Sequence, residues 1–346
     1  MNTSMPKSQD IEDIKSVLSH YELGELQSIK PTSEGMTNDN WFIITGTGRY
    51  FLRRRHPLFS LASIDFELGL IEYLISKGFP TAPVIHSRDG SIRIGAFGRN
   101  WEVYKHIPGE RFNTSNLSQV YSAAQLLARF HVMAVGYKGD PYVGARRVID
   151  FNRAVKFIDI FEEELAAGKN RLGVLGTFLA PSLISFFRSQ AKTVLKGIIP
   201  LSRVPPTIIH GDFQPSNVIF SGNKAVALVD FGDSGLSYRA YDIAKAVLRF
   251  SALRPDYNDQ SNMYSFMDLE RASMFIGTYQ ERLPLSSLEI NAIPALLRGA
   301  YLYDVGFFLW KQTNPIQQAL WLFKAWQFSE WIDECGQVIK EILSSR

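Results

Sequence analysis

Residues 208–233 read IIHGDFQPSNVIFSGNKAVALVDFGD, and the rest of the chain can be interpreted outward from them. His210, Asp212 and Asn217 form an H-x-D-x-x-x-x-N pattern, and Asp230 opens a D-F-G triplet. Between Asn217 and Asp230, two apolar runs are separated by a Ser-Gly-Asn turn, the signature of a β-hairpin. Such a hairpin brings Asp230 back beside Asn217, so the pattern predicts two carboxylates and an amide close together.

These side chains suit the transfer of a phosphoryl group. That reaction needs little covalent help from a protein, but it needs an oriented nucleophile and a divalent cation on the phosphates. Asp212 can accept the proton of an attacking hydroxyl, while Asn217 and Asp230 offer the oxygen ligands that Mg²⁺ prefers. The alternative is a polar turn before an ordinary hairpin, because His, Gly, Asp and Asn are all common in turns. The complete ordered set favours the phosphoryl-transfer hypothesis.

The motifs HGDFQPSN and VDFGD resemble the catalytic loop and metal-binding strand end of the aminoglycoside phosphotransferase-like superfamily, which includes choline, homoserine, hydroxylysine and N-acetylhexosamine kinases. The resemblance implies ATP and Mg²⁺ as cofactors, Asp212 as the catalytic residue, and Asn217 and Asp230 as metal ligands. Asp242 resembles the buried Asp that braces the catalytic loop in this family. A surface carboxylate at a helix N-terminus is the alternative for Asp242.

The remaining sequence predicts an α+β, two-lobed, protein-kinase-like fold. Short β-rich runs fill Gln27–His106 and predict a five-stranded antiparallel sheet, with one amphipathic helix at Ser63–Lys77. We expect residues 1–107 to form a nucleotide-binding lobe and residues 108–346 to form a helical catalytic and substrate-binding lobe. The helices expected in the second lobe are Leu117–Val135, Phe151–Ala167, Leu183–Ile198, Tyr241–Phe250, Met263–Arg282, Leu288–Trp310 and Pro315–Leu343.

A polar loop stands between the first two expected strands, where kinases fold a loop over the nucleotide phosphates. It reads SEGMTNDN from residue 33, and its single glycine makes it a weaker signal than G-x-G-x-x-G. Small polar side chains would share the phosphate contacts with backbone N–H groups. The residues expected to contact the nucleotide here are Ser33, Gly35, Thr37 and Asn38.

Arg53 stands in the strand whose Lys grips the nucleotide phosphates in this family. Arginine can clamp phosphate bidentately, but its planar fork differs from an ammonium point charge. Strand alternation places Arg53 and Arg55 on one face and Arg54 on the other. The alternative is a solvated basic end to the strand. Glu67, in the amphipathic helix, is expected to hold the Arg53 cation, with Glu72 as the second candidate.

The strand Trp101–Ile107 resembles the hinge strand of the family, which leads into the connector between the lobes. The resemblance implies that backbone groups of Lys105 and Ile107 contact adenine and that Tyr104 lines the rear wall of the adenine slot. Backbone contacts leave no signature in the side chains, so this prediction rests on the resemblance alone.

Two residues are expected on the substrate side. Asp233, just after D-F-G, could bind an amine, and Arg298, in an RGAYL run that resembles bacterial homoserine kinases, could bind an anionic group. A hydroxylated metabolite that carries nitrogen suits both: an amino alcohol, a hydroxy-amino acid or an amino sugar. The residues around the catalytic loop argue against naming homoserine. The alternatives are an aminoglycoside-type antibiotic phosphotransferase and a catalytically weak, pseudokinase-like binding module.

A protein substrate is less favoured, because HGD replaces the HRD of protein kinases and no A-P-E follows D-F-G. The net charge of +3, from 37 basic and 34 acidic residues, gives no reason to expect nucleic acid. One cysteine, Cys335, excludes an internal disulfide and a cysteine-rich zinc site. The N-terminus lacks an apolar secretory segment, and the longest uncharged stretch, residues 172–187, is shorter than the roughly 20 residues of a spanning helix. We expect a cytoplasmic protein with a small-molecule substrate and no membrane partner.

Overall fold

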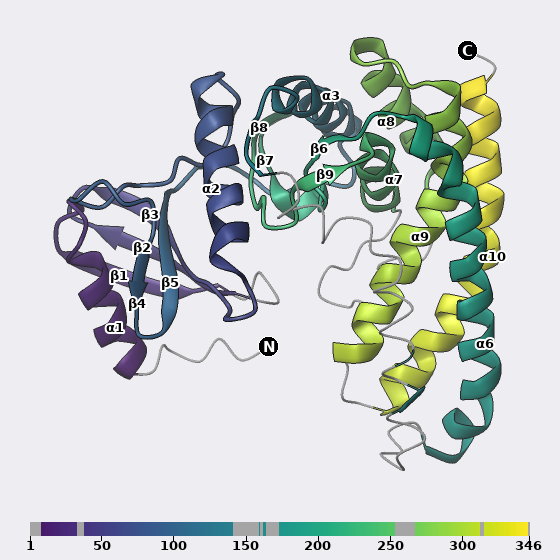
Figure 1. Ribbon diagram of the computed structural model, residues 1–346, viewed down its shortest axis with the longest axis horizontal. Helices are drawn as coiled ribbons and strands as arrows, with labels where there is room; N and C mark the ends of the chain where they lie inside the picture. Colours follow the sequence, from purple (N-terminus) through teal and green to yellow (C-terminus); the bar gives the residue numbers. More distant parts are fainter. Residues whose placement is uncertain are drawn as a thin grey trace.

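The computed structural model describes residues 8–32, 38–140, 159, 162–163, 173–252, 267–311 and 315–344. Its N-terminal part is a five-stranded sheet with strand order β1-β2-β3-β5-β4, in which every neighbouring pair is antiparallel (Figure 1). The strands are β1 (Leu26–Pro31), β2 (Asp39–Thr45), β3 (Gly48–Arg54), β4 (Ile94–Ala96) and β5 (Arg99–Lys105).

The two faces of the sheet bury different kinds of side chain, because successive residues of a strand point to opposite sides. On one face, helix α1 (Ser8–Leu18) packs Ile14 and Val17 with apolar strand residues such as Trp101 and Val103. On the other face, Glu102 and Tyr104 alternate with them and point toward helix α2 (Leu61–Ser76). The α2 face of the sheet is therefore a buried polar face.

The C-terminal part is mostly helical. Its long helices α6, α9 and α10 run side by side, and α9 also packs on α7 while α3 packs on α8 (Figure 1). One apolar core extends from α2 through α3 and α7 to α9 and α10, so the sheet-side helix and the helical part share buried contacts. The helices are α3 (Leu117–Ala134), α6 (Gly173–Ile198), α7 (Arg239–Phe250), α8 (Leu269–Arg282), α9 (Ser287–Lys311) and α10 (Pro315–Ser344).

Four short strands lie between α6 and α7. Strand β6 (Thr207–Ile209) pairs with β9 (Gly235–Ser237), and β7 (Val218–Ser221) pairs with β8 (Lys224–Leu228). A single turn of 3-10 helix over Pro215–Asn217 precedes β7. The predicted hairpin is therefore present, and the polar residues after Ile209 form a loop that leads into it.

The predicted α+β class and the five-stranded antiparallel sheet are confirmed. Helix α6 begins ten residues before the predicted Leu183, and Pro181 lies inside it. Helix Phe151–Ala167 lies almost wholly outside the described residues, as does the start of predicted helix Met263–Arg282. The division at residue 107 stays a prediction. In the part of the chain that the structure covers, no helix combines the length and apolarity that a bilayer crossing requires.

Candidate active site

The polar loop after β6, residues 210–217, is held in place by α7; we call it the HGD loop. Asp242, fully buried in the first turn of α7, accepts hydrogen bonds from the backbone N–H groups of His210 (2.7 Å) and Gly211 (2.8 Å). Its Oδ2 also lies 3.0 Å from Nε2 of His131, which comes from α3. Asp242 thus contacts the loop from inside the core, and the surface alternative for this residue is wrong.

His210 connects the HGD loop to the strand end that carries Asp230. Its Nε2 lies 3.1 Å from the carbonyl oxygen of Val229, and its Nδ1 lies 3.3 Å from the backbone N of Asp212. A carbonyl can only accept and a backbone N–H can only donate, so in these contacts Nε2 of the ring is the donor and Nδ1 is the acceptor. The buried ring therefore has a single orientation between loop and strand.

Asn217 is oriented by two acceptors from one residue. Its Nδ2 lies 2.8 Å from the backbone oxygen of Asp212 and 3.0 Å from Oδ2 of the same residue. Because both partners accept, the amide nitrogen faces Asp212, and the amide oxygen is turned away from it. The N–H of Val229 donates to the carbonyl oxygen of Asn217 (2.9 Å), so the hairpin brings Asp230 next to Asn217 as predicted.

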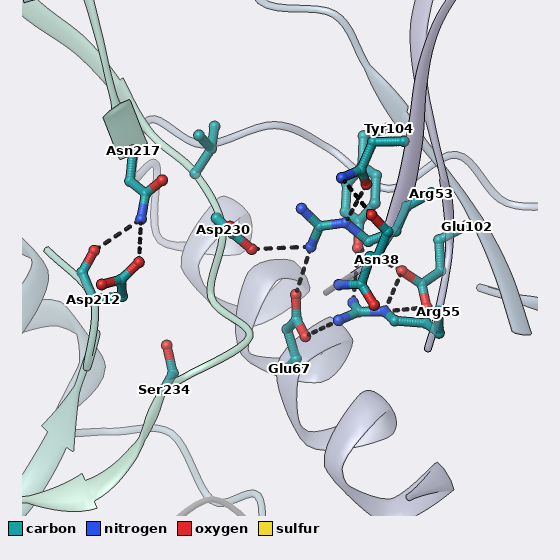
Figure 2. Close-up of polar contacts among 12 residues, drawn as sticks. Asn38, Arg53, Arg55, Glu67, Glu102, Tyr104, Asp212, Asn217, Asp230 and Ser234 are labelled. Carbon is teal, nitrogen blue, oxygen red and sulfur yellow. Dashed lines mark hydrogen bonds and ion pairs between the residues drawn. The ribbon is translucent and has the colours of Figure 1, made fainter. Parts of the chain in front are cut away.

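Asp230 lies between the HGD loop and the arginines of β3 (Figure 2). Its backbone has φ +68°, a left-handed conformation that is uncommon for a residue other than glycine and that often occurs at functional sites. Its Oδ1 accepts from Nη1 of Arg53 at 3.0 Å. Partial burial would raise the pKa of Asp230, whose side chain is 39% exposed, but the positive charges of Arg53 and Arg55 keep that pKa below its ordinary value. The carboxylate is therefore kept ionised.

Arg53 of β3 and Arg55, the first residue after β3, share one carboxylate on α2 (Figure 2). Nη1 of Arg53 lies 3.6 Å from Glu67 Oε1, while Nη1 of Arg55 lies 2.7 Å from Glu67 Oε2. Arg54 points to the opposite face of the sheet, where it pairs with Asp10 at 2.9 Å. The predicted alternation holds, and Glu67 is closer to Arg55 than to the predicted partner Arg53. Glu72 instead pairs with the exposed His86 at 2.6 Å.

A second acid completes this buried cluster. Nε of Arg55 lies 2.8 Å from both carboxylate oxygens of Glu102, and the hydroxyl of Tyr104 donates to Glu102 Oε2 at 2.9 Å. Burial raises the pKa of Glu102, although Arg55 works in the opposite direction. Burial also raises the pKa of Tyr104 well above its ordinary value, so its phenol stays protonated. Arg55 is the cation that holds Glu67 and Glu102 together.

The other predicted nucleotide contacts have the following surroundings. Ser33, Gly35 and Thr37 lie outside the described residues. The Oδ1 of Asn38 accepts from the N–H of His56 at 2.9 Å. The N–H of Lys105 donates to the carbonyl oxygen of Pro83 (2.8 Å), so a contact from Lys105 to adenine would have to use another group. The adenine roles of Tyr104, Lys105 and Ile107 stay predictions.

The predicted substrate residues lie on different elements. The backbone oxygen of Asp233 lies against Gly211, so Asp233 is close to the HGD loop. Nε of Arg298 lies 2.6 Å from Oδ1 of Asp333, and this ion pair joins α9 to α10. The structure therefore brings Asp233 next to the loop and shows Arg298 bound to a carboxylate of its own chain. Substrate binding by either residue stays a prediction.

Two residues of the site were not predicted from the sequence. Lys245 of α7 lies 2.7 Å from Oδ1 of Asp212, and His131 bonds Asp242. Asn40, a polar residue of the predicted phosphate loop, accepts from Nε of Arg53 at 3.1 Å. Lys245 follows Asp242 by three residues, so the two share one face of the helix. This spacing could have indicated from the sequence that Lys245 lies near the same loop as Asp242. A histidine on an apolar helix carries no comparable signal.

Asn217 and Asp230 fit Mg²⁺ as partial ligands, because an amide oxygen and an ionised carboxylate are hard oxygen donors. Within the described residues, no group of three or more His, Cys, Asp or Glu side chains is arranged to hold a metal ion without other ligands. Mg²⁺ is commonly bound by one or two carboxylates together with substrate phosphates and waters. The donor set therefore matches a cation that arrives with a nucleotide.

Comparison with known proteins identifies relatives over most of the chain. The model of the phosphotransferase enzyme family matches residues 28–275. A homoserine kinase of Caulobacter vibrioides is 26% identical over 295 residues, which cover 84% of this chain and 83% of that protein. A homoserine kinase of Nitrobacter winogradskyi is 25% identical over 291 residues, which cover 84% of this chain and 81% of that protein.

Solved structures share the fold at low sequence identity. An aminoglycoside phosphotransferase from Alicyclobacillus acidocaldarius superposes with a TM-score of 0.68 at 16% identity, covering 100% of this chain and 98% of that one. A microcompartment-associated aminopropanol kinase gives 0.68 at 16% identity, with 94% and 99% coverage. The amicoumacin kinase in complex with AMP-PNP and Ca²⁺ gives 0.68 at 16% identity, with 95% and 94% coverage. These similarities confirm the predicted kinase-like fold.

Proposed function

The chain belongs to the phosphotransferase enzyme family, and on that premise we propose that it transfers the γ-phosphoryl group of ATP to a hydroxyl of a small, nitrogen-containing metabolite in the presence of Mg²⁺. Membership makes it a kinase-type phosphotransferase that acts on the hydroxyl of a small molecule, and the family implies ATP as the donor. The proposal adds the metal, the residue roles and the class of acceptor.

One observation carries the proposal: Asp212 and Asn217 lie in direct contact, and the hairpin returns Asp230 beside them. We assign Asp212 to the acceptor hydroxyl, whose oxygen attacks the γ-phosphorus as the bond to the β-phosphate oxygen breaks and ADP leaves. We assign Asn217 and Asp230 to Mg²⁺, which when bound would offset the negative charge of the phosphates. Arg53, beside Asp230, is suited to grip those phosphates.

The acceptor class is supported by relatives and by one acid near the loop. Homoserine kinases are among the relatives, and an aminopropanol kinase and an ethanolamine kinase are among the similar structures. By their names, these proteins act on compounds that carry a hydroxyl and an amine. Asp233 follows D-F-G and lies against Gly211, where its carboxylate could bind an amine. We therefore favour an amino alcohol, a hydroxy-amino acid or an amino sugar.

The test is a coupled ADP-release assay with ATP and Mg²⁺ over hydroxylated amino acids, amino alcohols, hexosamines and aminoglycosides. Asp212→Asn serves as the matched control, because the change keeps the shape of the side chain and removes its charge. We expect the highest kcat/KM from a compound of the favoured class. A neutral sugar as the best acceptor would contradict the proposed class, and an aminoglycoside as the best acceptor would support the antibiotic-modifying alternative.

A pseudokinase-like binding module is the alternative from another class. No acceptor would stimulate ADP release in that case, although Mg²⁺ and nucleotide would still bind. Autophosphorylation that Asp212→Asn abolishes would instead indicate a protein acceptor. The direct contact between Asp212 and Asn217 favours turnover over the binding-module alternative.

A further inference from the structure

Lys245 is a buried cation in direct contact with the proposed catalytic carboxylate. It lies on α7, three residues after Asp242, and is 5% exposed. Its Nζ lies 2.7 Å from Oδ1 of Asp212 and 3.3 Å from the carbonyl oxygen of Gly211. One face of α7 therefore contacts the HGD loop twice: Asp242 accepts from backbone N–H groups, while Lys245 donates to a carbonyl and to the Asp212 side chain.

The contacts of Asp212 differ between its two carboxylate oxygens. Oδ2 accepts from Nε2 of Gln214 at 2.7 Å and from Nδ2 of Asn217 at 3.0 Å. Oδ1 accepts from Lys245. Each carboxylate oxygen has two lone pairs, so within the described contacts Oδ2 is filled and Oδ1 has room for one further donor. An acceptor hydroxyl therefore fits best at Oδ1, beside the ammonium of Lys245.

The surroundings of Lys245 keep its ammonium charged. Burial lowers the pKa of a lysine, but the negative charges of Asp212, Asp304 and Asp233 raise the pKa of Lys245 well above its ordinary value. Four single-bond rotations separate this ammonium from its backbone, and burial against α7 and the loop restricts them. A charged, immobilised donor can hold a carboxylate in one orientation.

We propose that Lys245 is a positioning residue for phosphoryl transfer, which fixes the Asp212 carboxylate so that Oδ1 faces the acceptor hydroxyl. This inference rests on the proposed function, since it assigns Lys245 a role through Asp212. The lysine takes one lone pair of Oδ1 and leaves the other for the hydroxyl proton. None of the described contacts of Lys245 involves Asn217 or Asp230, the residues that we assign to the metal and nucleotide.

The experiment compares Lys245→Met, Lys245→Arg and Asp212→Asn, using the best acceptor from the ADP-release panel and, separately, water as the acceptor in ATP hydrolysis. Lys245→Met should lower kcat by about 10²-fold, the effect of a misplaced reacting group. The KM for ATP should stay within about twofold, because no nucleotide contact is removed. Lys245→Arg should restore part of kcat, since a guanidinium can still donate to Oδ1.

A double variant separates positioning from packing. Adding Lys245→Met to Asp212→Asn should cause little further loss of kcat, because two residues that act through one group are not additive. Arg249→Met is the matched control: Arg249 also lies on α7, is 7% exposed, and pairs with Asp304 of α9 at 2.8 Å. Equal falls in kcat for Lys245→Met and Arg249→Met, at equal losses of Tm, would overturn the proposal.

The remaining outcomes are also distinct. A large fall in kcat for Asp212→Asn, without a fall in kcat for Lys245→Met, would overturn the role of Lys245 and leave the proposed function standing. If Asp212→Asn causes no fall in kcat, the proposed function itself is overturned. If Lys245→Met does not fold, Lys245→Gln replaces it in the same comparison, and additive losses in the double variant would again count against the proposal.

Discussion

Residue 211 is a point where the backbone of the HGD loop lies against the chain after Asp230. Gly211 has φ +79°, and a Cβ at this position would lie 2.1 Å from the backbone oxygen of Asp233. No side chain can occupy that space, and the contact involves backbone rather than a flexible side chain. The glycine of the HGD motif is therefore required by the approach of two backbone segments on either side of the site.

Gly211→Ala should destabilise the chain and lower kcat, because the loop and residue 233 must separate. Gly222→Ala is the matched control, since Gly222 also has positive φ (+56°) but a Cβ there would meet nothing within 4 Å. The control should cost only about 1–2 kcal/mol of left-handed strain and leave kcat unchanged. Thermal unfolding and steady-state kinetics measure both effects. Similar kinetics for the two variants would contradict the close-approach explanation.

Asp212 and Asp230 have separate partners, which predicts separate defects. Asp212→Asn should lower kcat by about 10²–10⁴-fold, the range for loss of an acid–base group, while nucleotide binding persists. Asp230→Ala should abolish the binding of Mg²⁺ with the nucleotide, because it removes the carboxylate ligand and the partner of Arg53. Titration calorimetry with Mg²⁺ and AMP-PNP distinguishes them. Equal nucleotide affinities of Asp212→Asn and Asp230→Ala would show that this division of roles is wrong.

At the scale of elements, the sheet is joined to α2 by charge as well as by apolar packing. Arg55, the first residue after β3, binds Glu67 of α2 and Glu102 of β5 and is 1% exposed. Both oxygens of Glu102 and Oε2 of Glu67 lie within 2.8 Å of Arg55, whereas Oε1 of Glu67 lies 3.6 Å from Nη1 of Arg53 and has no hydrogen bond within the described residues. The single buried guanidinium therefore offsets most of the charge of the two buried carboxylates. The position of Glu67, and with it the environment of Arg53, depends on this cluster.

Arg55→Met should lower the free energy of unfolding by about 3–5 kcal/mol, because it leaves two buried carboxylates without their cation. Arg93→Met is the matched control, since Arg93 also joins the sheet side to α2, through Asp65 at 2.8 Å, but at an exposed position. Exposed pairs contribute about 0–1 kcal/mol. Urea unfolding compares the two variants, and equal losses would contradict a special role for the buried cluster.

The N-terminal turn of α7 predicts a pH dependence. Burial would raise the pKa of Asp242, but hydrogen bonds from His131 and from the backbone of His210 hold it below its ordinary value. Such a carboxylate contributes stability above its unfolded pKa of about 3.9, and the contribution is lost as pH falls through the lower folded-state pKa. The difference in unfolding free energy between wild type and Asp242→Asn should stay constant from about pH 7 to 5 and shrink below about pH 4.

Urea unfolding of both proteins from about pH 7 to about pH 3 measures this difference. Asp242→Asn should also lower kcat at neutral pH, because the loop that carries Asp212 loses its brace. If the difference in unfolding free energy between wild type and Asp242→Asn instead grew as the pH fell, the assignment of Asp242 as a buried, ionised acceptor would be wrong.

At the scale of the whole molecule, the site lies where the sheet and the helical part meet. The hydrogen bond from Arg53 to Asp230 crosses from β3 to the end of the catalytic hairpin, over 177 residues of sequence. A second link follows β5, where Glu110 and Phe220 exchange backbone hydrogen bonds of 2.7 and 3.0 Å. A nucleotide that bridges Arg53 and the hairpin would therefore bind both parts at once.

Mg²⁺ with AMP-PNP should raise the Tm, because a ligand that binds only the folded chain stabilises it by about 2.7 kcal/mol at a hundred times its Kd. EDTA should remove most of the increase, and Arg53→Met should reduce it at the same ligand concentration. Differential scanning fluorimetry measures the shift. An increase in Tm that is unchanged by EDTA would contradict a metal-dependent nucleotide site.

The sequence alone determined the local features of this protein. The interval between Asn217 and Asp230 predicts a hairpin from residues that are neighbours along the chain, and the structure contains it. The alternation of Arg53, Arg54 and Arg55 follows from strand geometry in the same way. Patterns of this kind are legible because strand, turn and helix preferences depend on residues only a few positions apart.

Only the tertiary structure decided which side chains meet. Lys245 contacts Asp212 because α7 packs against the HGD loop, and Glu67 of α2 lies nearer to Arg55 than to Arg53. Arg298 pairs with Asp333 because α9 and α10 lie side by side. Each of these contacts joins residues on different elements. Which residue each side chain meets depends on how the elements pack together, and the spacing of residues along the chain does not contain that information.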